Sequence, residues 1–452
     1  MTPELLARYD RQVPRYTSYP TAPHFTADVD GAAYENWLGA IDAGETASLY
    51  LHIPFCREMC WYCGCNTRVV RREGPVRSYG ESLVAEIDRV ADAIPGRLRA
   101  GHVHFGGGSP NTLPPDALRH IVGRLRDRFA LTPETEIAVE IDPRSTSGEF
   151  IRACADAGVT RASLGVQELD SNVQLAVNRV QCFGLIAQLT AQLRGQGIRD
   201  INMDLMYGLP RQTVGSIVAT VDRITELDPT RIALFGYAHV PWMKKHMRLI
   251  DESRLPGAAE RWRQFEAATE RLLAHGYVAI GMDHFARPDS ALARAAADGT
   301  LHRNFQGYTT DTAEVLLGFG ASAIGSLPAG YVQNDTDVRG WQAAIAAGGF
   351  ATVKGCVLDD GDRMRRAVIE RLMCDMAVDV AGVVRRHGGD PEVFAPAMDA
   401  LVPMVRDGLV EIAGTVLRMT PRGRPLVRAA AAAFDRHLRT GPGESPRHAR
   451  AI

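Results

Sequence analysis

Long hydrophobic runs are missing from this 452-residue sequence. No apolar stretch is long enough to span a bilayer, and residues 1–20 lack the basic start and apolar core of a secretory signal. A strong charge of either sign is missing too, because the formal net charge is -2, which gives no electrostatic argument for nucleic acid or an anionic membrane. We therefore expect a folded cytoplasmic protein with no nucleic-acid partner and no membrane insertion.

Half of the cysteines have no spacing that would predict a disulfide or a shared metal site. Four of the eight are scattered in a way that is typical of small buried apolar residues, namely Cys154, Cys182, Cys356 and Cys374. The other four lie together in CREMCWYCGC, where Cys56, Cys60 and Cys63 have a CxxxCxxC spacing. This short segment is the most informative feature of the chain.

Three thiolates on one short loop suit iron held in a sulfide cluster, and they leave one iron of a cubane without a protein ligand. Such an open iron can bind a cofactor or a substrate. A structural zinc site, which normally needs a second ligand pair, and a disulfide staple are the alternatives. We interpret Cys65 as a neighbour of the cluster rather than a ligand, because a fourth protein ligand would close the open position.

The chain is long enough for a large barrel and an accessory domain. Short β-type runs alternate with helical stretches, which is typical of a parallel sheet with crossover helices. We predict six such strands, over residues 48–55, 102–106, 136–142, 161–167, 201–207 and 231–239. The fold class we expect is α/β, an incomplete (β/α)6 barrel with an N-terminal arm and a small, mostly helical C-terminal domain.

Alternation along the predicted strands separates an apolar face from a polar one. For example, Leu49, Leu51 and Ile53 oppose Tyr50 and His52. In a barrel covered by helices, the apolar face packs outward and the polar face lines the interior. A polar interior indicates a wide or incomplete barrel that admits a ligand. An antiparallel sheet with one wet face is the alternative, and the intervening helical stretches argue against it.

The domain limits follow from these patterns. We predict an N-terminal arm over residues 1–45, a catalytic barrel with its extension over 46–358, and a C-terminal helical or winged-helix-like unit over 359–452. In the last unit, LVEIAGTVLRMT at 409–420 indicates two short strands around Ala413 and Gly414. Since the chain has no basic bias, we expect this unit to cover the barrel rather than to bind nucleic acid.

A glycine-rich turn, GGGSP at residues 106–110, follows the second predicted strand. Consecutive glycines permit close approach of a ligand to the backbone, although this turn matches neither a phosphate-binding P-loop nor a GxGxxG fingerprint. Together with the cysteine loop, Tyr62 before the third cysteine, and Glu140 on the third strand, it resembles the radical S-adenosylmethionine superfamily.

Within that superfamily, the sequence resembles the oxygen-independent coproporphyrinogen III oxidase family. The segments that carry this resemblance extend over nearly the whole chain: PRYTSYPTA (14–22), YLHIPFC (50–56), CGC (63–65), GVQ (165–167), VNR (177–179), DLMYGLP (204–210), GMDHFARP (281–288) and LHRNFQGYTT (301–310). The CGC ending and the PRYTSYPTA and HRNFQGYTT segments separate this family from related radical enzymes and heme-chaperone-like paralogues.

The resemblance implies a [4Fe-4S] cluster on Cys56, Cys60 and Cys63, with S-adenosylmethionine on its open iron and a second molecule beside the first. The residues implied as cofactor contacts are Tyr50, Tyr62, Gly107, Gly108, Ser109, Glu140, Gln167, Arg179, Asp204, Ala238 and Ile324. The family often has threonine where Ser109 stands, and the hydroxyl group is kept. Arg15, His52, His284 and Arg303 are candidate partners for substrate carboxylates.

The implied reaction uses a 5′-deoxyadenosyl radical to decarboxylate two propionates of coproporphyrinogen III to vinyl groups, which gives protoporphyrinogen IX. It implies an oxidoreductase of heme and porphyrin biosynthesis, a monomer supplied by a low-potential electron donor such as flavodoxin or ferredoxin. The alternatives are a heme chaperone with a cluster, and a radical tetrapyrrole methyltransferase or heme-degrading enzyme on the same scaffold.

Overall fold

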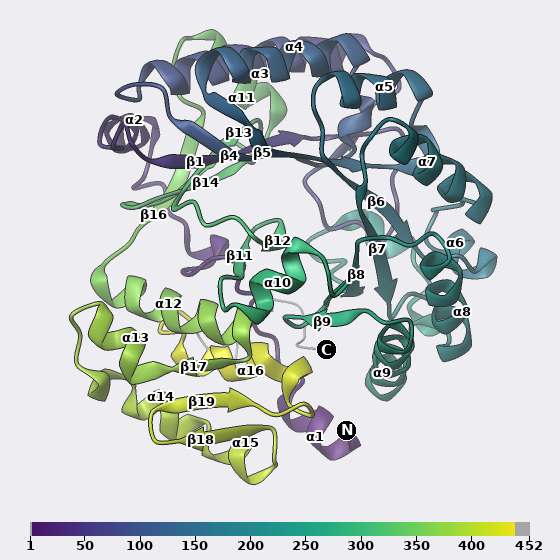
Figure 1. Cartoon of the computed structure of the whole chain (residues 1–452), viewed down its shortest axis with the longest axis vertical. Coiled ribbons are helices and arrows are strands. Elements are labelled where there is room, and N and C mark those ends of the chain that lie inside the picture. Colours follow the sequence, from purple (N-terminus) through teal and green to yellow (C-terminus); the bar gives the residue numbers. More distant parts are fainter. Residues whose placement is uncertain (1, 439–452) are drawn as a thin grey trace.

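The structure is a computed structural model, and it describes residues 2–438. An open sheet of 12 strands forms its centre, with helices along the convex side and the C-terminal elements across the concave side (Figure 1). The six predicted strands are neighbours in this sheet and run parallel, in chain order: β1 (Thr46–Ile53), β4 (Arg99–Gly107), β5 (Ala130–Ile141), β6 (Arg161–Gln167), β7 (Asp200–Tyr207) and β8 (Arg231–Gly236). The predicted α/β barrel is confirmed.

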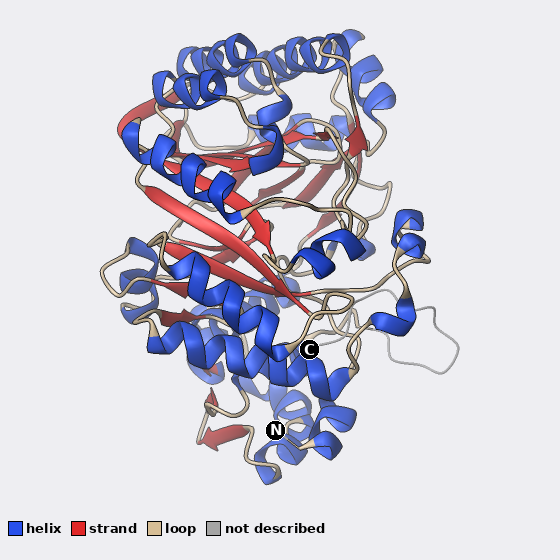
Figure 2. Ribbon diagram, turned by 90° about the vertical axis from the view of Figure 1, so that its right-hand side faces the viewer, coloured by secondary structure: helices blue, strands red, loops and turns tan. Residues whose placement is uncertain are grey.

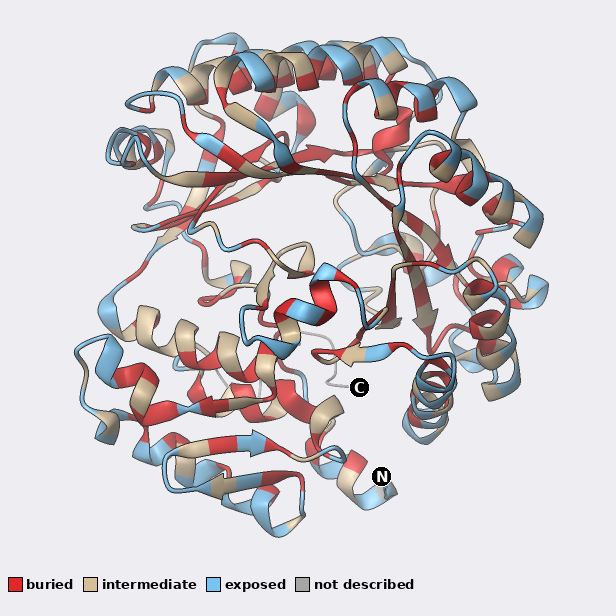
Figure 3. Cartoon of the chain, in the orientation of Figure 1, coloured by how far each residue is buried: buried red, intermediate tan, exposed pale blue. Residues whose placement is uncertain are grey.

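Crossover helices join these strands along the outer side of the sheet (Figures 1 and 2). They are α3 (Gly74–Asp92), α4 (Pro115–Arg128), α5 (Gly148–Asp156), α6 (Ser171–Ala176), α7 (Phe183–Gly195) and α8 (Val214–Thr225), and α9 (Ala258–Ala274) follows β8. Each of the longer helices presents one apolar stripe to the sheet; in α3 the buried stripe includes Val76, Leu83, Ile87 and Val90. Figure 3 shows this stripe as buried segments on the sheet side of the helices.

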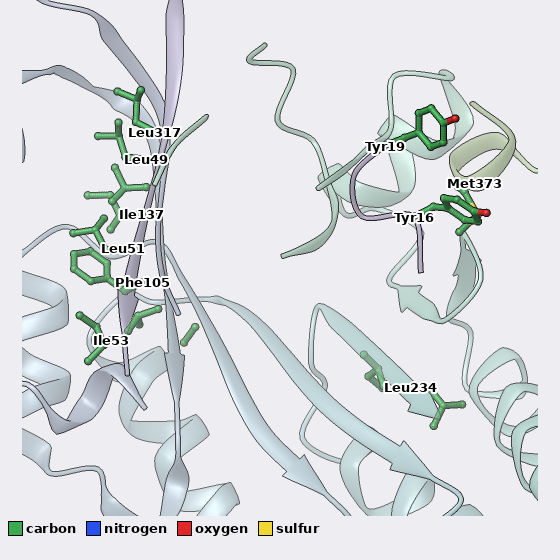
Figure 4. Packing of buried hydrophobic residues seen from close by; sticks show 14 of the residues in the cluster. Tyr16, Tyr19, Leu49, Leu51, Ile53, Phe105, Ile137, Leu234, Leu317 and Met373 are labelled. Carbon is green, nitrogen blue, oxygen red and sulfur yellow. The ribbon is translucent and has the colours of Figure 1, made fainter. Parts of the chain in front are cut away.

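Alternation in the strands places apolar side chains toward the helices, as predicted. Leu49, Leu51 and Ile53 of β1 are at most 1% exposed, and Figure 4 shows them on the helix side of the sheet with Phe105 and Ile137. Full burial of one such side chain contributes about 1.5–3 kcal/mol. This layer fixes which face of each strand is left for polar residues.

The sheet extends beyond the predicted six strands at both ends. Beside β1 lie β13 (Val315–Phe319), which is parallel to it, and then the antiparallel β14 (Ile324–Leu327), β15 (Gly330–Asn334) and β16 (Thr352–Val357), with α11 (Val338–Ala346) between the last two. Beside β8 lie β10 (His284–Ala286) and β9 (Val278–Ile280). In the described chain no pairing joins β16 to β9, so the barrel stays open.

Several small elements lie at the rim and the open side of the barrel. The strands β2 (Phe55–Cys56) and β3 (Arg68–Val69) pair at the base of the cysteine loop. The helix α10 (Ala291–Ala297) precedes a hairpin of β11 (His302–Asn304) and β12 (Gly307–Thr309), which carries the HRNFQGYTT segment. Figure 1 shows this hairpin between the sheet and the C-terminal elements.

The C-terminal elements are α12 (Asp360–Asp375), α13 (Val380–Arg386), α14 (Ala395–Ala400), α15 (Val402–Arg406) and α16 (Val427–Ala431), with a small sheet of β17 (Ala377–Asp379), β19 (Val416–Met419) and β18 (Val410–Ala413). The two strands predicted around Ala413 are therefore present, and a third strand joins them. Residues 439–452 of the predicted C-terminal unit lie outside the described residues.

The N-terminal segment contains α1 (Pro3–Tyr9), which contacts Asp407 of the C-terminal elements through Arg8 and Tyr9, and α2 (Gly31–Gly39), which lies beside β16. Tyr16 donates a hydrogen bond to Asp435 at 3.1 Å, and the Tyr19 hydroxyl accepts one from the Arg436 amide at 3.0 Å. Buried apolar residues of the N-terminal segment, the sheet and the C-terminal helices form one continuous cluster. In the part of the chain that the structure describes, no helix has the length and apolar character needed to cross a membrane.

Candidate active site

The cysteine loop is fixed from two sides. On one side, the Trp61 amide donates to the Val177 carbonyl at 3.0 Å, and the Asn178 side chain donates to the Met59 carbonyl at 2.9 Å. On the other side, His246 contacts the Cys63 carbonyl at 2.7 Å and Lys244 donates to the Cys65 carbonyl at 2.9 Å. These contacts hold the loop at the carboxyl ends of the parallel strands, where ligand sites of open α/β sheets lie.

Hydrogen-bond donors surround the sulfur atoms of the loop. The Sγ atom of Cys60 accepts from Arg144 at 3.2 Å and from Arg179 at 3.3 Å. The Sγ atom of Cys56 accepts from the Ser109 hydroxyl at 3.4 Å. Guanidinium and hydroxyl groups stabilise a thiolate, which is the form that binds metal.

The three cysteines share the wall of one cavity of about 170 Å³, which we call the cluster cavity. Eight of the eleven predicted cofactor contacts also line it: Tyr62, Gly107, Gly108, Ser109, Glu140, Gln167, Arg179 and Asp204. In the described residues, no three His, Cys, Asp or Glu side chains converge closely enough to hold a single metal ion. Three thiols on the wall of one cavity are the ligand set expected for an iron–sulfur cluster with one open iron.

A second cavity, the chamber, lies inside the barrel and has a volume of about 150 Å³. It shares Glu140, Ser163 and Asp204 with the cluster cavity, so the two spaces adjoin. Charged and polar side chains from the inward faces of β4 to β8 line it, including His102, His104, Glu136, Arg161, Asn202 and Arg231. This lining confirms the predicted polar interior of the barrel.

Glu140 is held between the glycine turn and a histidine. Its carboxylate accepts from the Gly107 amide at 3.1 Å and lies 3.2 Å from the ring nitrogen Nε2 of His104. Burial opposes ionisation, but the hydrogen bond and charge of His104 together with the Gly107 amide lower the pKa of Glu140 below its ordinary value. A carboxylate is therefore kept where the two cavities meet.

Gln167 has a strained backbone and an unpartnered side-chain oxygen, two features that are typical of ligand sites. It ends β6 in a left-handed backbone conformation, with a φ of 70°, which is unfavourable for a residue other than glycine. Its side-chain oxygen is buried and has no hydrogen-bond partner in the described structure, although the residue lines the cluster cavity. A buried carbonyl oxygen without a partner fits a bound group that donates a hydrogen bond.

The glycine turn is packed against the protein itself. A Cβ atom at Gly107 would lie 2.4 Å from His52, and one at Gly108 would lie 2.7 Å from the Phe55 carbonyl. The amides of Gly108 and Ser109 donate to the Ile53 and Phe55 carbonyls at 2.9 and 2.7 Å. The absence of side chains therefore serves the packing of this turn on the start of the cysteine loop, and it brings the Ser109 hydroxyl to the Cys56 sulfur.

Three predicted cofactor contacts do not line the cluster cavity. The Tyr50 ring stacks on His104, with 5.9 Å between ring centres, and its hydroxyl lies 2.9 Å from His52. Ala238 lies beyond the end of β8, on the wall of a different cavity. Ile324 starts β14 and packs beside a small apolar cluster that contains Tyr331. A cofactor role for these three stays a prediction.

The candidate carboxylate partners are dispersed. Both ring nitrogens of His52 are engaged, one with Tyr50 and the other with the Asn66 carbonyl at 2.9 Å. His284 lines the chamber and contacts Asp283 at 2.7 Å, and Arg15 pairs with the same Asp283 at 3.3 Å. Arg303 lines a further cavity on the open side of the sheet.

Sequence reasoning missed Arg144, Lys244 and His246, which contact the cysteine loop. Arg144 comes two residues after Asp142, just past the end of β5, so its position at a strand end was a usable signal. Lys244 and His246 follow β8 at the start of a short 3-10 helix (Lys245–Leu249), where no periodicity marks them. The interaction with Cys65, together with the charges of His246 and Lys244, lowers the pKa of the Cys63 thiol below its ordinary value.

Comparisons with known proteins agree with this geometry. The family model described as the Radical SAM superfamily matches residues 50–224, and the one described as the HemN C-terminal domain matches residues 358–426. The parallel barrel, the cysteine loop and the first of these matches define a radical S-adenosylmethionine protein. This class indicates a [4Fe-4S] cluster and S-adenosylmethionine as cofactors. The residues present fit them: hydrogen-bond donors surround the cysteine sulfur atoms, and the buried Gln167 oxygen has no hydrogen-bond partner in the described structure.

The chain is 49% identical over 453 residues to a protein of Bradyrhizobium diazoefficiens named oxygen-independent coproporphyrinogen III oxidase, and the match covers 100% of both chains. It is 43% identical to a protein of the same name from Paracoccus denitrificans, over 98% of each. The solved coproporphyrinogen III oxidase HemN of Escherichia coli is 35% identical, with a TM-score of 0.90 over 95% of this chain and 100% of that one. The chain therefore belongs to the oxygen-independent coproporphyrinogen III oxidase family.

Proposed function

We propose that this protein is an oxidoreductase that converts coproporphyrinogen III to protoporphyrinogen IX by decarboxylating two propionate side chains to vinyl groups. The observation that carries this proposal is the match of the whole chain, from end to end, to relatives that bear this name. The cluster cavity that opens on a polar chamber supports it, because it provides adjoining spaces for a radical source and a substrate side chain.

Cys56, Cys60 and Cys63 would hold the [4Fe-4S] cluster, with its fourth iron open to S-adenosylmethionine. Arg144 and Arg179 would balance the negative charge at Cys60, to which both donate hydrogen bonds. Tyr62, on the same cavity wall, would present its ring to the adenine. When bound, the cluster and S-adenosylmethionine supply the hydrogen-atom abstraction that starts each decarboxylation.

Two molecules of S-adenosylmethionine form part of the proposal. Glu140 and Asp204 lie on the walls of both the cluster cavity and the chamber, so each carboxylate can face a cationic ligand on either side. Gly107, Gly108, Ser109, Gln167 and Arg179 would contact the molecule at the cluster. Equilibrium dialysis of cluster-loaded protein tests this point, since a stoichiometry of one molecule per chain would contradict it.

We also propose a cytoplasmic monomer that takes electrons from a small low-potential carrier such as flavodoxin or ferredoxin. The use of Cys56, Cys60 and Cys63 as cluster ligands rather than in disulfides supports the location, because thiols stay reduced in the cytosol. Size-exclusion chromatography with light scattering tests the monomer. Anaerobic reduction of the cluster by each purified carrier tests the donor.

One anaerobic assay tests the reaction. Reconstituted protein, a reductant, S-adenosylmethionine and coproporphyrinogen III are incubated, and the products are read by mass spectrometry. Loss of two carbon dioxide molecules per substrate supports the proposal. Tight heme binding without a vinyl product would favour the chaperone alternative, and a methylated or ring-opened tetrapyrrole would favour the other radical enzymes.

A further inference from the structure

A third cavity lies between the barrel and the C-terminal elements, and we call it the outer cavity. Its volume is about 410 Å³, and it is formed by residues of the N-terminal segment (16–19), the β11–β12 hairpin, β14, β15 and α12. Pockets for small molecules usually measure roughly 300–1,000 Å³. The cluster cavity and the chamber are each below that range, so the outer cavity is the larger space beside them.

The outer cavity adjoins the chamber. Asn304, Thr309, Asp311 and Leu316 line both spaces. The chamber in turn shares Glu140 and Asp204 with the cluster cavity. The chamber therefore lies between the outer cavity and the cluster cavity.

Arg366 of α12 is on the wall of the outer cavity and has unused hydrogen-bond donors. Its guanidinium carbon lies 5.5 Å from the centre of the Tyr331 ring. Among the described residues, the guanidinium group of Arg366 makes no hydrogen bond, and no carboxylate lies within ion-pair distance of it. The Tyr331 hydroxyl, the only polar atom of that ring, is already bonded to the Tyr19 amide at 3.4 Å. All five N–H groups of Arg366 are available to a ligand.

Two more groups on this wall lack partners. The Nη1 atom of Arg303 is buried without a hydrogen bond, while its Nε atom donates to the Arg15 carbonyl at 3.4 Å. The Ser326 hydroxyl is also buried without a partner, and that residue is 6% exposed. Buried polar groups without partners are rare in folded proteins, and both of these residues line the outer cavity.

The remaining charged groups of this wall are engaged or lie at its edge. Glu370 contacts His302 at 2.9 Å, and Asp311 is bonded to Ser48. Arg363 donates to Asp360 at 3.0 Å and to the Pro328 carbonyl at 3.1 Å. Glu314 is exposed and forms no ion pair in the described structure. Arg366 and Arg303 are therefore the arginines of this wall that have no carboxylate within ion-pair distance, although the charges of Glu370 and Glu314 act on Arg366.

We propose that the outer cavity binds the tetrapyrrole substrate, with Arg366 and Arg303 as ligands for propionate carboxylates that are not reacting. Guanidinium groups match carboxylates by paired hydrogen bonds, and the aromatic rings of Tyr19, Phe305 and Tyr331 supply apolar walls for pyrrole rings. In this proposal the C-terminal helix α12 forms part of the substrate site, in addition to covering the barrel. This inference rests on the proposed function for the identity of the ligand.

Binding of coproporphyrin III and of its tetramethyl ester, measured by fluorescence titration, tests the site without turnover. Wild-type protein is expected to bind the tetra-acid at least about tenfold more tightly than the ester, because the ester cannot accept charged hydrogen bonds. In Arg366→Gln this preference is expected to disappear. In Arg366→Lys, which keeps the charge without the paired geometry, part of it is expected to return. An unchanged preference in Arg366→Gln would overturn the proposal.

Kinetics give a second readout. Arg366→Gln is expected to raise KM for coproporphyrinogen III by about tenfold or more, with KM for S-adenosylmethionine and cluster content unchanged. The matched control is Arg386→Gln, an exposed arginine of α13 in the same part of the chain. If wild-type protein fails to decarboxylate, the proposed function fails, whereas decarboxylation with a wild-type KM in Arg366→Gln refutes only the site.

A competing location can be tested in the same way. The lateral cavity, of about 260 Å³, is lined by Arg15, Arg261 and Arg428, and the Arg261 side chain donates no hydrogen bond in the described structure. It shares no lining residue with the chamber. If Arg261→Gln raises KM for the tetrapyrrole and Arg366→Gln does not, the substrate lies in the lateral cavity and our proposal is wrong.

Discussion

The Nη1 atom of Arg179 lies 3.3 Å from the sulfur of Cys60, a residue 119 positions earlier in the chain. The same guanidinium reaches Asp142 at 3.4 Å and bonds the Gly165 carbonyl. The ends of β5 and β6 and the cysteine loop thus meet at one buried cation. Substitution of Arg179 therefore tests whether a residue that does not bind the cluster influences its reactivity.

Arg179→Gln is expected to lower the rate of S-adenosylmethionine cleavage by about 10–100-fold while the cluster stays bound, because the three cysteines remain and only their charged support is lost. Formation of 5′-deoxyadenosine and the iron content measure the two effects. Arg119→Gln is the control, since that arginine forms only an exposed pair with Asp156. A rate within twofold of wild type would contradict the prediction.

Cys63→Ser is expected to abolish S-adenosylmethionine cleavage, whereas Cys65→Ser is expected to keep a cluster. The reason is that three ligands leave the open iron that the cofactor needs, and Cys65 is not among them. Electron paramagnetic resonance of the reduced proteins and iron analysis distinguish the two variants. Cys182→Ser, at an exposed cysteine away from the loop, is the control. Cluster-free Cys65→Ser protein would refute the three-ligand assignment.

Asp204 gives an expected pH dependence. Burial, and then the charge of Glu140, raise the pKa of Asp204 to about 6. Its carboxylate form, which can attract a cationic ligand, is therefore lost as the pH falls through that value. We expect kcat/KM for S-adenosylmethionine to fall below about pH 6 in wild-type protein. In Asp204→Asn the value should be lower and this acid limb absent, and a retained limb would assign it to another group.

Glu86 of α3 is expected to affect stability rather than catalysis. Its buried carboxylate accepts from Asn334 at 2.6 Å and from the Trp341 indole at 3.0 Å, and burial raises its pKa to about 7. The folded state therefore holds a proton more tightly than the unfolded state, so this contribution is full at low pH and is lost as the pH rises through about 7.

Thermal unfolding from about pH 5 to about pH 8 measures this effect, which amounts to at most about 3 kcal/mol. Relative to Glu86→Gln, wild-type protein should lose stability over that range, while the lost hydrogen bonds add an offset that is independent of pH. Glu81→Gln, on the exposed side of the same helix, is the control. Parallel curves for wild type and Glu86→Gln would show that Glu86 does not titrate there.

Local patterns were sufficient for the barrel strands but not for the sheet edges. The six parallel strands have regular alternation and are separated by amphipathic helices, so their existence and inward faces could be predicted. The flanking β9 and β10 have three residues each, too few for a period to appear. The strand predicted over 231–239 ends at Gly236, because the chain leaves the sheet there for the loop that carries Lys244 and His246.

In the candidate site, too, some features could be predicted from local sequence patterns and others could not. By itself, the sequence determined the chemistry of CREMCWYCGC and the polar strand faces, because ligand spacing and strand alternation are properties of neighbouring residues. Only the tertiary structure decided that Arg144 and Arg179 meet at Cys60, that Tyr50 supports Glu140 through His104, and that α12 brings Arg366 to the outer cavity. These contacts depend on how strand ends and distant segments converge in space, which no spacing along the chain records.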